Sequence, residues 1–243
     1  MGPPATVVLV HGAFHGAWCW SRVVAGLEAQ GVPALALDLP GHGASPCALA
    51  GLPEDAAWLR ARLEASREPV VLCGHSYGGC VITEAAESAG PVRHLVYLAA
   101  VAPDAGEALG DALPPEVTAR MAAALRPNAD GSVSIDPARA RELFYQDCDA
   151  DLARWAVGRL GPQRPESLLA PVSRAAWREI ESTYVVCERD GAIDASAQRR
   201  LARRCGRRLS WPTSHSPMLS QPARVVELLA GLAREVAAKA ERG

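Results

Sequence analysis

The chain has 243 residues, of which 49% are hydrophobic, and carries a formal net charge of −2 at neutral pH. This length fits one sizeable domain, and the weak net charge excludes the basic surface that nucleic-acid or anionic-membrane partners require. No apolar run approaches the roughly 18 residues of a membrane-spanning helix, and no secretory leader is recognisable. We therefore expect a cytoplasmic protein, monomeric or homodimeric, with no nucleic-acid or membrane partner.

Short apolar runs bounded by Gly or Pro alternate with helical patterns along much of the chain. The expected strands cover residues 6–10, 34–37, 70–73, 94–98, 183–187 and 208–211. Helices are expected at about residues 21–30 and 54–66, directly after residue 76, and at about 223–239. Such alternation is typical of a parallel sheet with helices on both faces. We predict an α/β fold with a mostly parallel sheet of about six strands.

Residues 103–176 interrupt this alternation. They contain helical patterns broken by prolines and glycines, and no convincing strand. Because this stretch is too long for a plain loop in a compact domain, we predict a helical insertion that forms a cap, or lid, over the rest. The expected division is a core of residues 1–102 and 177–243 with a cap at 103–176.

A possible nucleophile lies in the pentapeptide Gly74-His75-Ser76-Tyr77-Gly78, between an expected strand and an expected helix. In the order strand, Gly-x-Ser-x-Gly, helix, the serine occupies a sharp turn that exposes its hydroxyl beside a helix N-terminus. The glycines leave room for the turn. We interpret Ser76 as a nucleophile rather than as part of a structural glycine-rich turn.

A serine nucleophile needs a base, and a carboxylate that orients this base. Only His94 and His215 follow Ser76 in the sequence. His94 begins an apolar strand pattern and reads as structural. His215 lies in the loop between the last expected strand and the last expected helix, so it is the predicted base.

The predicted acid is Asp190, which follows the strand at 183–187 by a short turn. Asp104 and Asp194 are alternatives, although Asp194 reads as the cap of the helix that follows it. Asp38 precedes the nucleophile in the sequence and reads as a residue that organises its loop.

The two backbone N–H groups of an oxyanion hole should come from the residue after the nucleophile and from the loop after the first strand. We expect Tyr77 and Ala13 to supply them. His11 and His15, in the same loop as Ala13, read as structural or pocket-lining residues.

The seven cysteines are scattered, odd in number and without a C-x-x-C pair. This pattern predicts buried free thiols rather than disulfides, and it contains no zinc-binding spacing. We expect no metal and no organic cofactor.

Taken together, these segments resemble the α/β-hydrolase superfamily, and within it the branch of methylesterases and hydroxynitrile lyases with its bacterial esterase relatives. The resemblance rests on residues 11–20 (oxyanion loop), 74–79 (nucleophile turn), 185–193 (acid turn), 215–220 (histidine loop) and 143–148 (cap). The lyases similar to this chain carry a hydroxyl residue and a Lys where this chain has Gly12 and Ser216. The resemblance therefore implies an esterase.

We accordingly predict a serine hydrolase that cleaves a small-molecule carboxylic ester, of a small alcohol or an aryl group, or a lactone, through an acyl-enzyme. The alternatives are a cofactor-free C–C hydrolase or perhydrolase, a hydroxynitrile lyase, and a non-hydrolytic ligand receptor. Aromatic and apolar side chains that flank the predicted catalytic residues are candidates for the pocket lining, and the aromatic side chains of the cap either close the pocket or pack between cap and core. Together these side chains are Phe14, Tyr77, Phe144, Tyr145, Trp155, Trp177 and Met218.

Overall fold

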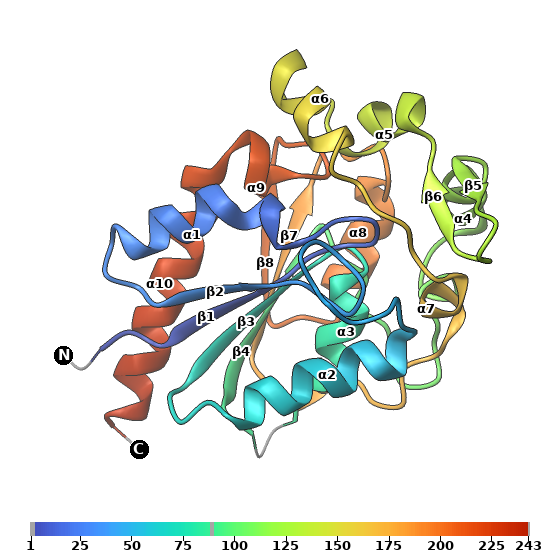
Figure 1. Ribbon diagram of the computed structural model, residues 1–243. Coiled ribbons are helices and arrows are strands. Elements are labelled where there is room, and N and C mark those ends of the chain that lie inside the picture. The colour runs from blue at the N-terminus through green and yellow to red at the C-terminus, as the bar shows by residue number, and fades with distance from the viewer. Residues whose placement is uncertain (1–2, 88–89, 243) are drawn as a thin grey trace.

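The computed structural model describes residues 3–87 and 90–242, and its centre is a six-stranded sheet in the order β2-β1-β3-β4-β7-β8 (Figure 1). All neighbouring strands in this sheet are parallel. The bounds are β1 Thr6–Val10, β2 Ala34–Leu37, β3 Val70–His75, β4 Val92–Leu98, β7 Ser182–Cys187 and β8 Arg207–Trp211. The predicted α/β-hydrolase fold, with about six mostly parallel strands, is confirmed.

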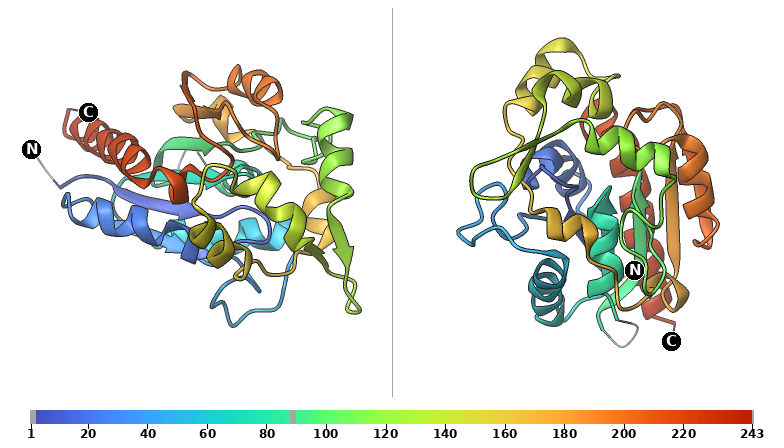
Figure 2. Two further views of the ribbon diagram at one scale, coloured as in Figure 1. Left: turned by 90° about the horizontal axis from the view of Figure 1, so that it is seen from above. Right: turned by 90° about the vertical axis from the view of Figure 1, so that its right-hand side faces the viewer.

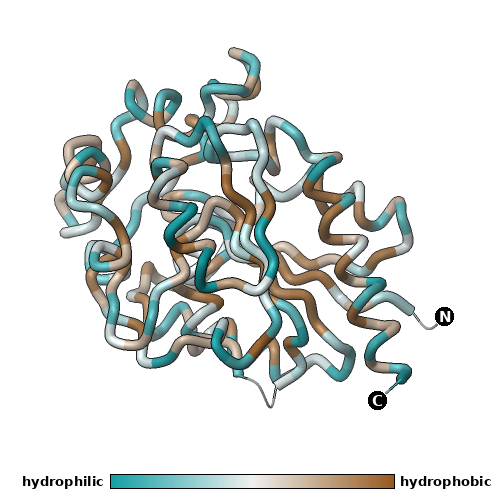
Figure 3. Tube along the Cα trace, turned by 180° about the vertical axis from the view of Figure 1, so that it is seen from behind, coloured by the Kyte–Doolittle hydropathy of each residue, from teal (hydrophilic) through white to brown (hydrophobic). Residues whose placement is uncertain are grey.

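Helices cover both faces of the sheet (Figures 1 and 2). α1 (Ser21–Glu28) and α10 (Pro222–Ala240) pack together on one face, and α2 (Leu52–Glu64) and α3 (Gly78–Ala85) pack together on the other. α8 (Ala195–Ala202) contacts β7. This double cover explains why every residue of β3 is buried and why its first four residues, Val70 to Cys73, are apolar without alternation. Figure 3 shows apolar segments running through the interior.

The segment between β4 and β7, which we call the insert, contains most of the remaining elements. Its members are α4 Pro115–Ala122, β5 Leu125–Pro127, β6 Val133–Ile135, α5 Pro137–Phe144, α6 Ala150–Val157, α7 Pro165–Leu169 and the 3-10 turn η2 Ala176–Arg178. Outside the insert lie the 3-10 turn η1 Ala17–Trp20 and the short helix α9 Pro217–Ser220.

The expectation that the insert contains no strand was wrong, because β5 and β6 form an antiparallel hairpin. Each strand has only three residues, so apolar alternation cannot develop in the sequence. Its tight turn includes Gly131 with φ +80, and Asn128 N–H donates to Ser132 O at 2.8 Å. The Asp-Gly pair at 130–131 is the turn signal of this hairpin.

All seven cysteines are free thiols; six are buried and Cys47 is exposed. Within the described ranges, no helix has the length and apolar character that a bilayer crossing requires.

Candidate active site

Ser76 lies in the turn between β3 and α3 and has φ +51, in the left-handed region that non-glycine residues rarely adopt. Backbone hydrogen bonds fix this turn: Ser76 O accepts from Gly79 N–H at 3.0 Å and from Val101 N–H at 3.1 Å. The turn is also tightly packed, since a Cβ added to Gly78 would lie 2.6 Å from His11 O. Ser76 is half-buried although the residues on both sides of it are buried. The fold therefore presents a strained serine at the carboxyl edge of the central strand.

His215 and Asp190 come together although 25 residues separate them. Because β7 and β8 are parallel neighbours, the loops after them open at the same edge of the sheet. The Nδ1 atom of His215 lies 2.7 Å from Oδ2 of Asp190, and both side chains are buried. The carboxylate accepts, so Nδ1 carries the proton and Nε2 is left with its lone pair. This is the tautomer that a general base needs.

The carboxylate of Asp190 is held by three further donors. Its Oδ1 accepts from the N–H groups of Ala192 at 2.7 Å and Ile193 at 2.9 Å. The Nε2 group of Gln198 donates to Oδ2 at 2.7 Å. The sequence analysis did not predict Gln198, which is fully buried on α8. The one sequence feature that could have indicated it is a polar residue on the apolar face of an amphipathic helix.

His75 connects the turn that carries Ser76 to the loop that carries His215. Its Nε2 group donates to the backbone oxygen of His215 at 2.8 Å, and the two ring centroids lie 4.6 Å apart. Burial, reinforced by the nearby rings of His215 and His15, lowers the pKa of His75 well below 6.5. His75 is therefore a neutral donor that holds the predicted base beside the predicted nucleophile.

The hydroxyl of Ser76 itself makes no side-chain hydrogen bond to the described residues, His215 included. Nucleophile–base contacts are often loose before substrate binds and tighten in the reacting complex. The structure thus brings the predicted base and acid into contact, and the base also contacts His75, the residue before the half-exposed Ser76.

The two N–H groups expected to form the oxyanion hole are free. Neither Ala13 N–H nor Tyr77 N–H has an acceptor within residues 3–87 and 90–242. The loop that carries Ala13 lies directly against the nucleophile, since a Cβ added to Gly12 would be 2.8 Å from Cβ of Ser76. Free backbone donors beside a serine can stabilise negative charge that develops on a carbonyl oxygen.

Among the candidate pocket residues, Phe144 contacts the ring of the predicted base. Its ring centroid is 5.5 Å from those of His215 and His15. Phe14, Tyr145 and Met218 are buried. The remaining two are more peripheral: Trp155 is 36% exposed on α6, and Trp177 donates its indole N–H to Pro103 O at 2.7 Å.

Tyr77 was a further candidate for the pocket lining, but its side chain points toward α2. Its hydroxyl donates to Oδ2 of Asp55 on α2 at 2.7 Å, so the ring packs into the core. Only the backbone N–H of Tyr77 remains available at the site.

The alternative acids have other partners. Asp104 pairs with Arg178 near the surface, and this ion pair lowers the pKa of the carboxyl. Asp194 occupies the N-cap position of α8, as expected, but its side chain pairs with Arg120 at 2.8 Å and makes no capping hydrogen bond. Asp38 organises its loop as predicted, because Oδ1 and Oδ2 accept from the N–H groups of Ala17 and Ala44.

The other histidines make structural contacts. His94 on β4 lies 2.8 Å from the hydroxyl of Thr183. His11 Nε2 accepts from Leu39 N–H at 3.1 Å. Burial lowers the pKa of His94 and of His15 to about 4.

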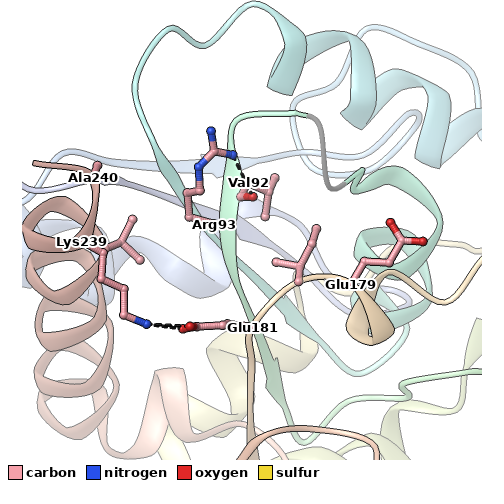
Figure 4. A pocket seen from close by; sticks show the side chains of 8 residues that line it. Val92, Arg93, Glu179, Glu181, Lys239 and Ala240 are labelled. Carbon is pink, nitrogen blue, oxygen red and sulfur yellow. Dashed lines mark hydrogen bonds and ion pairs between the residues drawn. The ribbon is translucent and has the colours of Figure 1, made fainter. Parts of the chain in front are cut away.

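A pocket of about 350 Å³ opens at the opposite edge of the sheet, where β4 and β7 begin (Figure 4). An ion pair between Lys239 and Glu181, at 2.6 Å, crosses it. None of the predicted site residues lines this pocket. Ligands of open parallel sheets bind outside the carboxyl ends of the strands, so this pocket is not the reaction site. Within the part of the chain that the structure describes, no three His, Cys, Asp or Glu side chains are grouped to hold a metal ion.

The fold and this arrangement at the carboxyl edge define an α/β hydrolase, and comparison with known proteins agrees. Residues 7–228 match the alpha/beta hydrolase family, and the chain belongs to it. It is 34% identical to the carbendazim hydrolyzing esterase of Nocardioides sp. (strain SG-4G), over 94% of this chain and 99% of that protein. It is 32% identical to the alpha/beta hydrolase nvfD of Aspergillus novofumigatus, over 94% and 96%. The crystal structure of a pyrethroid hydrolase from Sphingobium faniae JZ-2 matches with a TM-score of 0.81 and 27% identity, over 94% of this chain and 97% of that one.

Proposed function

We propose that this chain is a carboxylic ester hydrolase in which Ser76 is the nucleophile, His215 the general base and Asp190 the residue that orients the base. The observation that carries the proposal is the buried 2.7 Å contact between His215 and Asp190, which His75 connects to the turn that holds Ser76 at positive φ. Membership of the hydrolase family and similarity to a named esterase support the same class.

In the proposed reaction, Oγ of Ser76 attacks the ester carbonyl carbon while its proton passes to Nε2 of His215. The carbonyl oxygen becomes an oxyanion that accepts from the N–H groups of Ala13 and Tyr77. The C–O bond to the alcohol then breaks, and His215 returns the proton to the departing oxygen. Water attacks the acyl-enzyme in the same way and releases the acid.

The insert acts in this proposal as a cap that separates a small-molecule ester from water. What supports this role is its contact with the site: Phe144 faces the His215 ring, and the hydroxyl of Tyr145 donates to His15 Nε2 at 2.7 Å. Apolar groups beside the base suit an acyl or aryl group. The neutral Ser216 after His215 supplies no cation for departing cyanide, which favours an esterase over a lyase.

A panel of p-nitrophenyl and aryl methyl esters, with a cyanohydrin alongside, tests the proposal. The enzyme should hydrolyse at least one ester at about 1–10³ s⁻¹, and Ser76→Ala should reduce kcat by about 10⁴- to 10⁶-fold. Circular dichroism of the variant shows whether it remains folded. Full hydrolysis by folded Ser76→Ala would contradict the mechanism, and ester binding without turnover would indicate a receptor.

A further inference from the structure

The insert forms hydrogen bonds with both the backbone N–H and the backbone C=O of Phe14, the residue after Ala13 in the oxyanion loop. Gly161 N–H donates to Phe14 O at 2.8 Å, and Phe14 N–H donates to Oε1 of Gln163 at 3.2 Å. Phe14 is thus fixed from both sides by residues about 150 positions away in the sequence. Within the described residues, no other residue of the loop at 11–16 has both its backbone N–H and its backbone C=O hydrogen-bonded to the insert.

Phe14 has φ +67, a conformation that a non-glycine residue keeps only when its surroundings enforce it. The peptide between Ala13 and Phe14 is fixed at both ends, because Ala13 O accepts from Nδ1 of His15 at 2.8 Å and Phe14 N–H donates to Gln163. The Ala13 N–H belongs to the preceding peptide and is left free; the carbonyl oxygen of that peptide, Gly12 O, accepts from His15 N–H at 3.2 Å and lies 2.8 Å from Nδ1 of His11. The two consecutive peptides are thus fixed together, the first by the loop itself and the second also by the insert.

The side chain of Gln163 is itself rigidly held. It is fully buried, and its backbone pairs in both directions with Val133 of β6, at 2.9 and 2.8 Å. Its Nε2 donates to Oγ of Ser167 at 2.6 Å, which fixes the orientation of the amide. Its Oε1 accepts from Phe14 and also lies 2.9 Å from Nε2 of His42. A buried amide with this many partners presents its carbonyl oxygen to the oxyanion loop in one orientation.

We propose that Gln163 is a positioning residue for the oxyanion hole, so that the free N–H of Ala13 is correctly aimed only when the insert is docked on the core. This inference rests on the esterase mechanism proposed above. It assigns the insert a second role in the reaction besides covering the substrate. Gln163 touches neither substrate nor nucleophile; it acts through Phe14.

Three substitutions test the role. Gln163→Met keeps the length of the side chain but removes the acceptor, Gln163→Asn withdraws the amide by one methylene, and Gln163→Glu keeps an acceptor oxygen. Because loss of an oxyanion donor costs 10²–10³ in rate, a misaligned donor should cost about 10- to 100-fold in kcat for the Met and Asn variants. KM should change less than about threefold, since the interaction develops mainly in the transition state. Gln163→Glu should recover most of kcat.

The affinity of a transition-state analogue distinguishes a positioning role from a purely structural one, because it depends on the direction of the oxyanion-hole donors. When an aryl trifluoromethyl ketone reacts, the bond from Ser76 Oγ to the carbonyl carbon forms, the ketone oxygen becomes an oxyanion and the hydroxyl proton passes to His215. Its affinity for Gln163→Met should fall by the same factor as kcat/KM. The affinity of the carboxylic acid product should stay unchanged.

Asn128→Ala is the matched control in the same hairpin. It removes hydrogen bonds of 2.9 Å to Ser132 and to Ser134 and touches no residue of the loop at 11–16. It should lower the thermal midpoint while kcat stays within about twofold. Unchanged kcat and analogue affinity in both Gln163→Met and Gln163→Asn would overturn the positioning role, as would an equal loss in Asn128→Ala. Absence of any ester hydrolysis by the wild-type enzyme would instead overturn the proposed function.

Discussion

Asp190 is the residue at which most hydrogen bonds of the site converge: two backbone N–H groups, the amide of Gln198 and the ring of His215. Every one of these partners donates, so the position requires a group that only accepts. An asparagine would turn an NH₂ group toward one of these donors and would favour the wrong tautomer of His215.

Asp190→Asn should therefore lower kcat by about 10⁴-fold with little change in KM, measured on the best ester of the panel. The control is Asp104→Asn, which changes the alternative acid and its surface ion pair with Arg178. Its kcat should stay within about threefold. A larger loss in Asp104→Asn than in Asp190→Asn would move the acid to position 104.

Asp55 is a buried carboxyl with an unusual pKa. Burial raises this pKa to about 7, and the hydrogen bond from Tyr77 offsets only part of the effect. The other carboxyl oxygen, Oδ1, has no partner among the described residues. Between about pH 4 and pH 7 the folded state holds a proton here that the unfolded state does not, so this group destabilises the fold as pH rises.

We expect the free energy of unfolding of the wild type, relative to that of Asp55→Asn, to decrease by about 2 kcal/mol from pH 5 to pH 7.5. Urea titrations of both proteins at the two pH values measure it. A difference that stays constant with pH would show that Asp55 keeps an ordinary pKa.

At the scale of elements, the sheet was predictable and its ends less so. The six expected strands overlap the six observed ones, and the apolar runs are clearest in β1 and β3, because a strand buried on both faces selects such residues. The edge strand β8 has three exposed residues and begins with two arginines. The sequence pattern stops at Cys73, yet β3 continues to His75, since Gly74 and His75 still pair with Tyr97 and Leu98 of β4. Backbone pairing with a neighbouring strand leaves no signal in the local hydropathy of the sequence.

The candidate site divides in the same way. Ser76, Asp190 and His215 each follow a strand, and their position at one edge of the sheet could be predicted because parallel strands end together. Gln163 and Asp147 act across the junction between insert and core, where nothing in the local sequence specifies the partner. These contacts depend on how the insert docks, which only the structure reveals.

Asp147 joins the insert to the histidine loop. It accepts from Ser214 N–H at 2.9 Å, from the Ser214 hydroxyl and from the Ser220 hydroxyl at 3.1 Å. Ser214 directly precedes His215, so this carboxylate fixes the backbone on which the predicted base is mounted.

We predict that Asp147→Ala lowers kcat about tenfold and speeds hydrogen exchange at the Ser214 amide, because the loop loses three hydrogen bonds. Asp149→Ala is the control in the same segment. It removes the N-cap of α6, a bond of 2.8 Å to Leu152 N–H, and should cost about 1 kcal/mol of stability without changing kcat. Equal kcat in Asp147→Ala and the wild type would show that the hydrogen bonds from Asp147 to the histidine loop do not position His215.

Across the whole molecule, burial lowers the pKa of five of the six histidines. They are His11, His15, His42, His75 and His94. Below about pH 6.5 these histidines bind protons in the unfolded chain but not in the folded chain, so the free energy of unfolding decreases as pH falls. Asp55 acts in the opposite direction over the same range, but it is one group against five.

The free energy of unfolding should therefore be several kcal/mol lower at pH 5 than at pH 7.5. Urea unfolding followed by tryptophan fluorescence measures the difference. Equal or greater stability at pH 5 would mean that these histidines are protonated in the folded protein.

The proposed mechanism requires Ser76 to be an activated nucleophile, and labelling with an alkyl fluorophosphonate tests this most directly. Mass spectrometry of peptides from the treated enzyme should find one adduct, on Ser76, which an ester substrate protects. Labelling should be abolished in Ser76→Ala and slowed by orders of magnitude in His215→Ala. An adduct on another residue, or none in an enzyme that still hydrolyses esters, would contradict the account.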